Sequence, residues 1–303
     1  MAYKYGKVAV LLGGVSNERE ISLQSGKAVL AALKNMDIDA YPLDPKYDDL
    51  NDLKAKNFDR AFVCLHGKDG EDGKVQGIMD ELNIPYTGSG KSASAKGMDK
   101  LISKSIWRDN NLCTPEFLRV KSINDYEEIV STLNLPFFMK PANSGSSIGI
   151  NKVNSEKDFI RAFDEAIIYD SNVIAEKMII GREYTIPIVG QRILPIIEIQ
   201  TNTEFYDYAA KYTRDDTKFI CPTNLSSNII KEANAISLRA FNLLGCKGWG
   251  RVDFIIDSKN NFFIIEINTI PGMTSHSLVP LSAKNLGISF EELSLKILET
   301  SCV

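Results

Sequence analysis

GRVDFIIDSKNNFFIIEIN, residues 250–268, has two apolar runs around a polar, turn-rich centre, and this pattern predicts a β-hairpin. Side chains alternate between the two faces of a strand. Arg251 and Asp253 therefore share one face of the first strand. Glu266 and Asn268 likewise share one face of the second. The hairpin is thus expected to present a row of carboxylate and amide oxygens on one side.

The register of the hairpin predicts a metal site. With a four-residue loop at Ser258–Asn261, Asp253 lies directly opposite Glu266. Two carboxylates that face each other across a strand pair, with Cβ atoms about 4.5 to 5.5 Å apart, repel unless a cation lies between them. Their hard oxygens suit Mg²⁺, with water and phosphate oxygens completing its shell. The alternative is a solvated face on which Arg251, opposite Asn268, pairs with a carboxylate; that pairing leaves the amide unexplained, so we prefer the metal.

Strands and helices alternate in the first part of the chain. In order, the expected elements are the strand Lys4–Leu12, the helix Ile21–Leu33, the strands Ile38–Leu43 and Arg60–Leu65, and a helix near Gly73–Leu82. Such alternation predicts a parallel sheet whose ligands bind beyond the carboxyl ends of its strands. Residues 13–18 and 66–71 are expected at that edge.

From Gly97 onward the pattern predicts α+β structure. Helices are expected at Asp99–Asn110, Glu156–Ile168 and Ser226–Leu244, and strands at Glu116–Val120, Phe137–Lys140, Ile148–Val153, Val173–Lys177, Tyr184–Val189, Ile193–Gln200, Trp249–Ile256 and Phe262–Asn268. The polar stretch Thr201–Phe219 has little periodicity, as is common in lids over functional sites. We therefore expect an α/β protein: a Rossmann-like parallel-sheet domain at residues 1–98, followed by two α+β lobes at 99–182 and 183–303.

The composition is that of a globular protein and excludes several classes of partner. The 303 residues are 44% hydrophobic and 24% charged, and the net charge of −4 without a basic run argues against nucleic acid. The longest apolar run, Ala28–Leu33, is far shorter than the about 20 residues of a membrane helix. The start of the chain lacks a signal-peptide pattern, and its five cysteines are scattered. We therefore expect a cytoplasmic protein without disulfides.

Two glycine-containing loops are candidate ligand sites. KPANSGSSIG, residues 140–149, joins two expected strands and has small residues that let backbone N–H groups approach an anion. It is not a Walker A loop, because Lys140 precedes the glycines. Alone it is equally typical of a hairpin turn, but beside the carboxylate hairpin it indicates a nucleoside triphosphate. LGGVSNE, residues 12–18, departs from the dinucleotide pattern, and its Glu18 either serves a helix dipole or holds a substrate ammonium.

Eight segments spread over nearly the whole chain carry a family resemblance. They are LLGGVSNEREISLQSG (11–26), LHGKDGEDGKVQG (65–77), YTGSG (86–90), MDK (98–100), KPANSGSSIG (140–149), YDYAAKY (206–212), GRVDF (250–254) and EINTIPGMTSHSLVP (266–280). Together they resemble the D-alanine–D-alanine ligase family of the ATP-grasp superfamily.

The resemblance implies an ATP-grasp fold and the ATP-dependent joining of two D-alanines for peptidoglycan. ATP would phosphorylate the carboxylate of the first D-alanine, and the amine of the second would attack the acyl phosphate, with ADP and phosphate as the other products. A carboxylate is a poor electrophile until one of its oxygens becomes a leaving group, so this order is chemically sensible. Two Mg²⁺ ions, or Mn²⁺ in their place, and a homodimer are also implied.

The resemblance also implies roles for individual residues. Asp253, Glu266 and Asn268 would hold the metal ions. The nucleotide would be bound by Lys100, Lys140 and Lys211 at the phosphates, Glu176 and Glu183 at the adenine and ribose, and Ser147, Lys177, Met178, Phe205 and Ile265 around them. The substrates would be bound by Glu18 and His66 at the first D-alanine, Ser277 and the Leu278 N–H at the second carboxylate, and Arg251 with the Gly272 N–H at the tetrahedral intermediate. Ser146 and Tyr212, hydrogen-bonded with Glu18, would tie the lid over the site.

Two other functions match parts of the pattern. One is another ATP-grasp ligase, such as one joining D-alanine to D-lactate, but Tyr212 after Lys211 matches the dipeptide-forming pattern and opposes it. The other is a nucleotide-binding sensor without turnover, which would not need the set formed by Glu18, Arg251 and their partners. Phosphate release with and without D-alanine separates the sensor from the enzyme.

Overall fold

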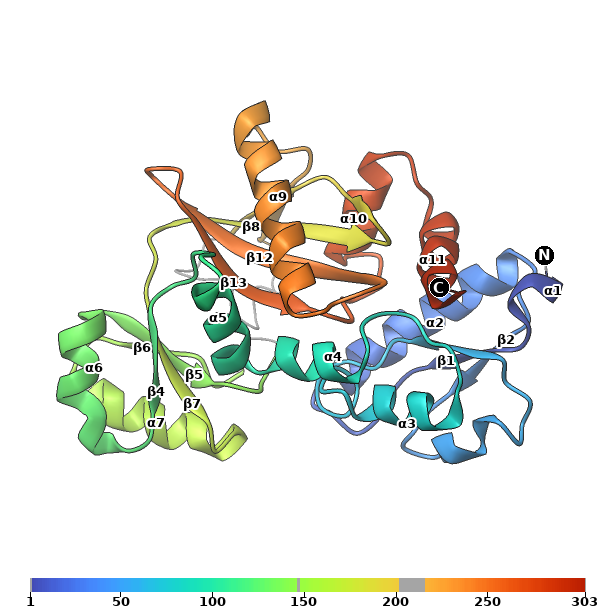
Figure 1. The fold of residues 1–303 in the computed structure, drawn as a ribbon, viewed down its shortest axis with the longest axis horizontal. Helices are drawn as coiled ribbons and strands as arrows, with labels where there is room; N and C mark the ends of the chain where they lie inside the picture. The colour runs from blue at the N-terminus through green and yellow to red at the C-terminus, as the bar shows by residue number, and fades with distance from the viewer. Residues whose placement is uncertain (1, 146–147, 202–215, 303) are drawn as a thin grey trace.

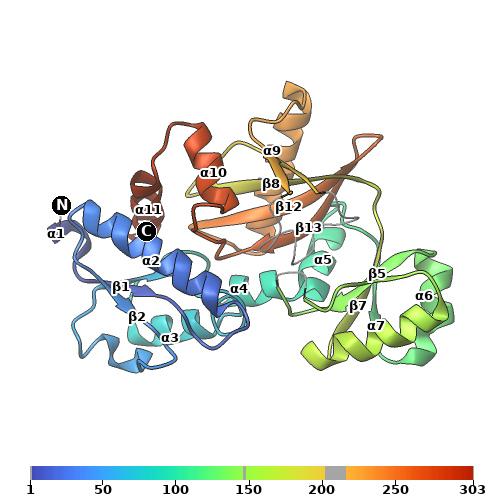
Figure 2. The same cartoon turned by 180° about the vertical axis from the view of Figure 1, so that it is seen from behind.

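A computed structural model of the chain describes residues 2–145, 148–201 and 216–302, and these contain three β-sheets (Figure 1). Along the chain, a parallel sheet comes first, a four-stranded antiparallel sheet second and a six-stranded antiparallel sheet third. In Figures 1 and 2 the first two sheets lie toward opposite ends of the molecule, and the third lies above and between them. The predicted α/β architecture, a parallel sheet followed by α+β structure, is confirmed.

The first sheet is parallel, with strand order β2-β1-β3. Its elements are β1 (Val8–Leu11), α2 (Arg19–Asn35), β2 (Ala40–Leu43), β3 (Arg60–Val63) and α3 (Lys74–Leu82). All four residues of β1 are buried, as expected of a central parallel strand. Residues of both loops, 13–16 and 66–70, line one cavity, which confirms that they lie at the same edge of the sheet.

The second sheet has strand order β4-β7-β5-β6 and is covered by helices on one face. Its elements are β4 (Phe117–Val120), α6 (Tyr126–Leu133), β5 (Phe137–Pro141), β6 (Asn151–Val153), α7 (Glu156–Tyr169) and β7 (Val173–Lys177). The covered face carries Phe137, which packs against Phe159 of α7. The alternate residues Phe138 and Lys140 lie on the other face, beside Glu176 of β7.

The third sheet has strand order β11-β10-β8-β12-β13, with β9 beside β8. Its elements are β8 (Gly181–Val189), β9 (Arg192–Ile193), β10 (Ile197–Gln200), β11 (Lys218–Ile220), α9 (Ser227–Leu243), β12 (Trp249–Asp257) and β13 (Phe262–Asn268). The predicted strand Ile193–Gln200 is wrong as a single element. It is divided into β9 and β10 around Pro195, which has no N–H for a strand ladder.

Helices near both ends of the chain complete the first sheet. Four helices were not predicted from the sequence: α4 (Lys91–Met98), α6, α10 (Leu278–Asn285) and α11 (Phe290–Glu299). The predicted first strand began too early, because residues Ala2–Tyr5 form the helix α1. α10 and α11 pack in the same core as β1 and β3. The Tyr5 hydroxyl donates to Glu299 of α11 at 3.0 Å. Figures 1 and 2 accordingly show the two ends of the chain close together.

Helix α5 (Lys100–Asp109) connects the first region to the other two. Asp99 caps it by accepting hydrogen bonds from two backbone N–H groups of its first turn. Trp107 is fully buried in the core of the third sheet and donates to the Ala240 carbonyl at 3.2 Å. The domain boundaries at residues 98 and 182 stay a prediction. Helix α5 belongs to the predicted domain at 99–182, but it packs against the third sheet, which lies mostly after residue 182. None of the helices in the described part of the chain has the length and apolarity to cross a membrane.

A candidate active site between the antiparallel sheets

The second and third sheets enclose a cleft with an apolar part and a charged part. Apolar lining comes from Pro115, Phe138, Ile148, Ile150, Ile179, Ile255 and Ile265. Charged lining comes from Lys100, Lys140, Glu176, Lys177, Glu183, Asp253 and Glu266. A flat base fits the apolar part, and phosphates fit the lysines. Met178, which was predicted near the nucleotide, is not among the described residues that line this cleft.

The hairpin β12–β13 brings its polar residues together in the predicted register. Asp253 lies opposite Glu266, and Arg251 lies opposite Asn268. Arg251 donates to both carboxylate oxygens of Asp253, from Nε at 2.8 Å and from Nη2 at 2.7 Å. Asn268 Nδ2 donates to Asp253 Oδ2 at 2.9 Å, and Thr185 Oγ1 of β8 donates to Oδ1 at 2.5 Å. The Arg–carboxylate pair that we weighed against a metal is therefore present.

The predicted loop Ser258–Asn261 lies between the end of β12 and the start of β13. The pairs nearest the loop are shifted by one residue from the predicted register, because Ile256 pairs with Phe262. A β-bulge at Ile265 restores the register before Glu266. Because of the bulge, Ile265 and Glu266 both line the cleft, although neighbouring residues in a regular strand point to opposite faces. The bulge thus places an apolar contact and a candidate metal ligand side by side.

The donor set of the hairpin fits a divalent ion that shares its shell with a phosphate chain. Among the described residues, no group of three or more His, Cys, Asp or Glu side chains is placed to hold a metal by itself. Asp253, Glu266 and the amide of Asn268 offer hard oxygens, and nucleotide and water oxygens would have to complete the shell. Lys100 Nζ lies 3.7 Å from Glu266 Oε2. In this structure, cationic side chains thus neutralise both facing carboxylates.

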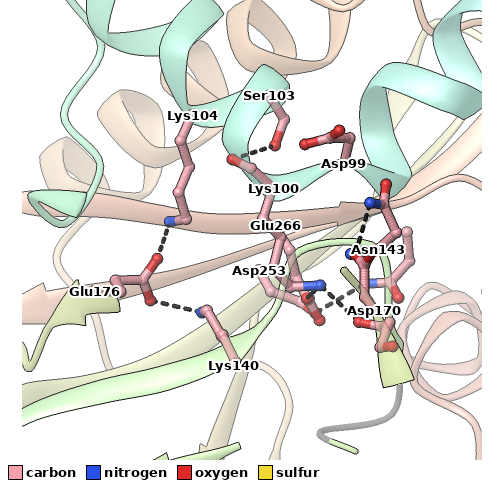
Figure 3. A network of polar contacts seen from close by, with 12 residues as sticks. Asp99, Lys100, Ser103, Lys104, Lys140, Asn143, Asp170, Glu176, Asp253 and Glu266 are labelled. Atoms are coloured by element: carbon pink, nitrogen blue, oxygen red, sulfur yellow. Dashed lines mark hydrogen bonds and ion pairs between the residues drawn. The ribbon is translucent and has the colours of Figure 1, made fainter. Parts of the chain in front are cut away.

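Lys100 and Lys140 line the charged part of the cleft, and Lys104 lies behind it (Figure 3). Lys100 Nζ donates to the Ser144 carbonyl at 2.7 Å and so anchors the predicted glycine loop. Lys140 Nζ donates to Glu176 Oε1 at 2.7 Å, and Lys104 Nζ lies 2.5 Å from Oε2 of the same carboxylate. Burial pushes the pKa of Glu176 upward, but the two ammonium groups outweigh this and hold it below its usual value. Burial lowers the pKa of Lys104 to about 8.

A second cavity contains Glu18 and lies beside the glycine loop. It is lined by residues from the first sheet's loops, from α4, and by residues 143–145 and Ile148. A Cβ atom placed on Gly67 would lie 2.4 Å from Glu18 Oε2, and one placed on Gly145 would lie 3.2 Å from it. Gly67 also has a φ of +68°, which favours glycine. The Glu18 carboxylate thus lies where the two loops meet.

Arg19 fixes the loop that carries Glu18. Its guanidinium pairs with Asp44 at 2.7 Å and donates to the Gly14 carbonyl at 2.6 Å. Asp44, at the end of β2, in turn accepts from the Gly14 N–H at 3.0 Å. The loop after β1 is therefore tied to the end of the neighbouring strand.

His66 is buried and neutral. Its Nδ1 lies 2.9 Å from the Ile270 carbonyl oxygen, so this nitrogen carries the proton. Its Nε2 accordingly accepts from the Ser25 hydroxyl at 3.2 Å, and the Ser25 oxygen accepts from the Met273 N–H at 3.0 Å. Burial lowers the pKa of His66 to about 4, and the Arg251 guanidinium adds to this effect. His66 lines the cavity at the strand ends rather than the one that Glu18 lines.

Glu71 joins the first sheet's loop to the loop after β13. Its Oε2 accepts from the Gly67 N–H at 2.8 Å, and its Oε1 accepts from the Ile270 N–H at 3.2 Å. Burial raises the pKa of Glu71 above its usual value, and the Glu18 carboxylate adds to the rise. Glu71 was not among the predicted site residues, although it lies within the segment at 65–77.

The loop before α10 brings together the residues predicted for the second substrate. Ser277 is the N-cap residue of α10, and Leu278 begins the helix. Ser277 Oγ accepts from the Thr274 N–H at 2.9 Å. A Cβ atom placed on Gly272 would lie 2.8 Å from that Oγ, so the two predicted residues are neighbours. A helix N-terminus with a hydroxyl beside it suits a carboxylate.

Some predicted site residues lie outside the described ranges, and some participants were not predicted. Those outside the described residues are Ser146, Ser147, Phe205, Lys211 and Tyr212. Those not predicted include Lys104, Glu71 and Thr185. Lys104 follows Lys100 by one helical turn, and this spacing would have indicated a shared direction. Thr185 becomes a partner of Asp253 only through the pairing of β8 with β12.

Comparison with known proteins agrees with the site. The family model described as "D-ala D-ala ligase C-terminus" matches residues 106–299, and the one described as "D-ala D-ala ligase N-terminus" matches residues 46–89. The chain is 48% identical over 297 residues to D-alanine–D-alanine ligase B of Chromobacterium violaceum, covering 98% of each.

Solved structures show the same relationship. A D-alanine–D-alanine ligase from Bacillus anthracis superposes with a TM-score of 0.87 and 36% identity, covering 98% of this chain and 97% of that one. A structure of D-alanine–D-alanine ligase from Bacillus anthracis complexed with ATP superposes with a TM-score of 0.84 and 32% identity, with the same coverage.

The fold and the cleft define an ATP-grasp protein: two antiparallel sheets enclose lysines, carboxylates and an apolar wall. Within that class, the chain belongs to the D-alanine–D-alanine ligase family, because the family models cover most of it and a relative is 48% identical over 98% of its length. The predicted family is thereby confirmed.

Proposed function

We propose that this protein is an ATP-dependent ligase that joins two D-alanines into D-alanyl-D-alanine for peptidoglycan synthesis. The observation that carries the proposal is the end-to-end similarity to D-alanine–D-alanine ligases, including one solved with ATP, together with the charged and apolar lining of the cleft in this chain. The γ-phosphoryl group of ATP moves to a carboxylate oxygen of the first D-alanine, and ADP leaves. The amine of the second D-alanine then attacks the carbonyl carbon, loses a proton and displaces phosphate.

The lysines neutralise the phosphates. Lys140 and Lys100 lie at the charged part of the cleft, and the proposal assigns both to ATP phosphates, with Lys211 as a third. Adenine lies in the apolar part between Phe138 and Ile265, which come from the two facing sheets. Electrostatic stabilisation of this kind acts most strongly where a site excludes water.

Asp253, Glu266 and Asn268 are the proposed ligands of two Mg²⁺ ions, with Mn²⁺ as a substitute. When bound, these ions neutralise the charge that develops between the nucleotide and the acceptor carboxylate. Arg251 is held in the hairpin by Asp253, so its guanidinium is oriented before substrate arrives. The proposal assigns Arg251 and the Gly272 N–H to the oxyanion of the tetrahedral intermediate.

The two D-alanines bind on either side of the reacting carboxylate. Glu18 holds the ammonium of the first, beside Gly67 and Gly145. Ser277 and the Leu278 N–H hold the carboxylate of the second. His66, being neutral, orients the loop at the first subsite through its hydrogen bond to Ile270 and carries no charge there.

Product analysis tests the proposed function. ADP release is measured with D-alanine, L-alanine and D-lactate, alone and in pairs, and the ligation product is identified by mass spectrometry. We expect D-alanine alone to support turnover and to yield the dipeptide, whereas L-alanine alone yields none. Preferred formation of the D-alanine–D-lactate ester, or ATP hydrolysis without a ligated product, would overturn the proposal.

The proposal also includes a cytoplasmic location and a homodimer. Light scattering after size-exclusion chromatography tests the dimer.

A further inference from the structure

One buried lysine lies behind the cleft without lining it. Lys104 of α5 has a fully buried side chain (0% exposed), and its Nζ lies 2.5 Å from Glu176 Oε2. The other oxygen, Oε1, accepts from Lys140 Nζ at 2.7 Å. Glu176 and Lys140 line the cleft, whereas Lys104 does not. A carboxylate thus lies between two ammonium groups, one on the cleft wall and one behind it (Figure 3).

Lys104 is fixed to the third sheet. Its ammonium also donates to Thr114 Oγ1 at 2.8 Å, and that hydroxyl donates its own proton to the Ile264 carbonyl at 2.7 Å. Ile264 belongs to β13 and immediately precedes the bulge that turns Ile265 and Glu266 into the cleft. The ammonium of Lys104 is therefore held from the side of the large sheet, through Thr114.

Binding of a phosphate by Lys140 changes the pairing of Glu176. The ammonium must leave the carboxylate or divide itself between two anions. A buried carboxylate that loses its cation is strongly unfavourable. Lys104 would prevent this situation, because it pairs with Oε2 whereas Lys140 pairs with Oε1, so the carboxylate would keep one cation.

We propose that Lys104 is a positioning residue for the nucleotide: it keeps Glu176 paired, so that Lys140 is available to the phosphates. The proposal rests on the proposed function, because it takes Lys140 to be a phosphate ligand. It gives Lys104 no contact with the nucleotide. It therefore predicts that Lys104 governs the part of the affinity that depends on phosphate and not the part that depends on the base.

The test compares two ligands that differ only in phosphates. Binding of ADP, with Mg²⁺, and of adenosine is measured by calorimetry for the wild type and for Lys104→Met. In this variant the Glu176 carboxylate still has one cationic partner, Lys140, so the buried charges cancel and the protein is expected to fold. We expect the dissociation constant of ADP to rise by about tenfold or more, in line with couplings between contacting charges, while that of adenosine changes by less than about twofold.

A double-mutant cycle shows whether the effect passes through Glu176. In the Glu176→Gln background there is no carboxylate to keep paired, so adding Lys104→Met is expected to change ADP binding by less than about twofold. Arg108→Met is the matched control, because Arg108 is a cation one turn further along α5 that is mostly exposed and pairs with Asp109. It should leave the binding of both ligands unchanged.

Several results would overturn the proposal. The first is that Lys104→Met weakens the binding of ADP and of adenosine equally. The second is that Lys104→Met still weakens ADP binding tenfold in the Glu176→Gln background. The third is that folded Lys104→Met binds ADP as tightly as the wild type does. If Lys104→Met does not fold, Lys104→Gln is measured in the same way; failure of both to fold would make Lys104 a folding residue and also overturn it. Wild-type protein that binds neither ligand would instead refute the proposed function itself.

Discussion

His66 should make the stability of the protein fall in mild acid. The imidazole is buried and neutral, with a pKa of about 4, against 6.5 for the ordinary side chain. Between these values the unfolded chain binds a proton that the folded protein does not, so the free energy of unfolding rises with pH there. The contribution of His66 to the free energy of unfolding is fully present above pH 6.5 and decreases as the pH drops toward 4. Below pH 4 this residue causes no further loss of stability.

The size of the effect follows from the two pKa values. Each full pH unit between them is worth about 1.4 kcal/mol, so the loss from this group reaches about 2 kcal/mol by pH 5 and about 3 kcal/mol by pH 4. Burial is the main cause, because the imidazolium would be taken out of water beside the Arg251 guanidinium. The Ile270 carbonyl favours the protonated ring but does not compensate.

Urea unfolding of the wild type and of His66→Asn, at constant ionic strength from pH 7 to pH 4.5, measures the effect. The Asn amide can still donate to the Ile270 carbonyl but does not titrate. At pH 7 the variant should be less stable by about 1 kcal/mol, because it loses the contact with Ser25. The difference should shrink and then reverse as the pH falls. A difference between the two proteins that stays constant from pH 7 to pH 4.5 would refute the reasoning.

Three further predictions concern the reaction. Glu266→Gln keeps the shape but removes a negative metal ligand, so ADP formation should fall by orders of magnitude with the circular-dichroism spectrum retained; normal turnover at low Mg²⁺ would contradict the assigned role. Gly67→Ala places a Cβ 2.4 Å from Glu18 Oε2 at a φ of +68°, so it should raise KM for D-alanine and destabilise the fold by about 1 kcal/mol or more; an unchanged KM would mean that Glu18 is not at the first subsite. Tyr212→Phe removes only a phenolic oxygen, so it should increase phosphate release without ligation and weaken selection of D-alanine over D-lactate; unchanged product ratios would leave Tyr212 a packing residue.

The hairpin illustrates how far sequence pattern reaches. Alternation along residues 250–268, together with a four-residue loop, placed Asp253 opposite Glu266, and the structure has that pairing. Near the loop the pairs are shifted by one residue from that register, and the bulge at Ile265 restores it before Glu266. A bulge leaves the composition of a strand unchanged, so only the pairing of the two strands reveals it.

The sequence by itself determined the elements whose periodicity is local, the parallel first sheet and the family to which the chain belongs, because these depend on neighbouring residues and on ordered motifs. Only the tertiary structure decided which distant segments share a core: α10 and α11 close the first sheet from the other end of the chain, and α5 packs Trp107 into the third. It also decided the pairing of Lys104 with Glu176, residues of a helix and a strand far apart in sequence. The physical reason is that burial and charge pairing depend on which surfaces meet, and no local pattern of residues encodes that meeting.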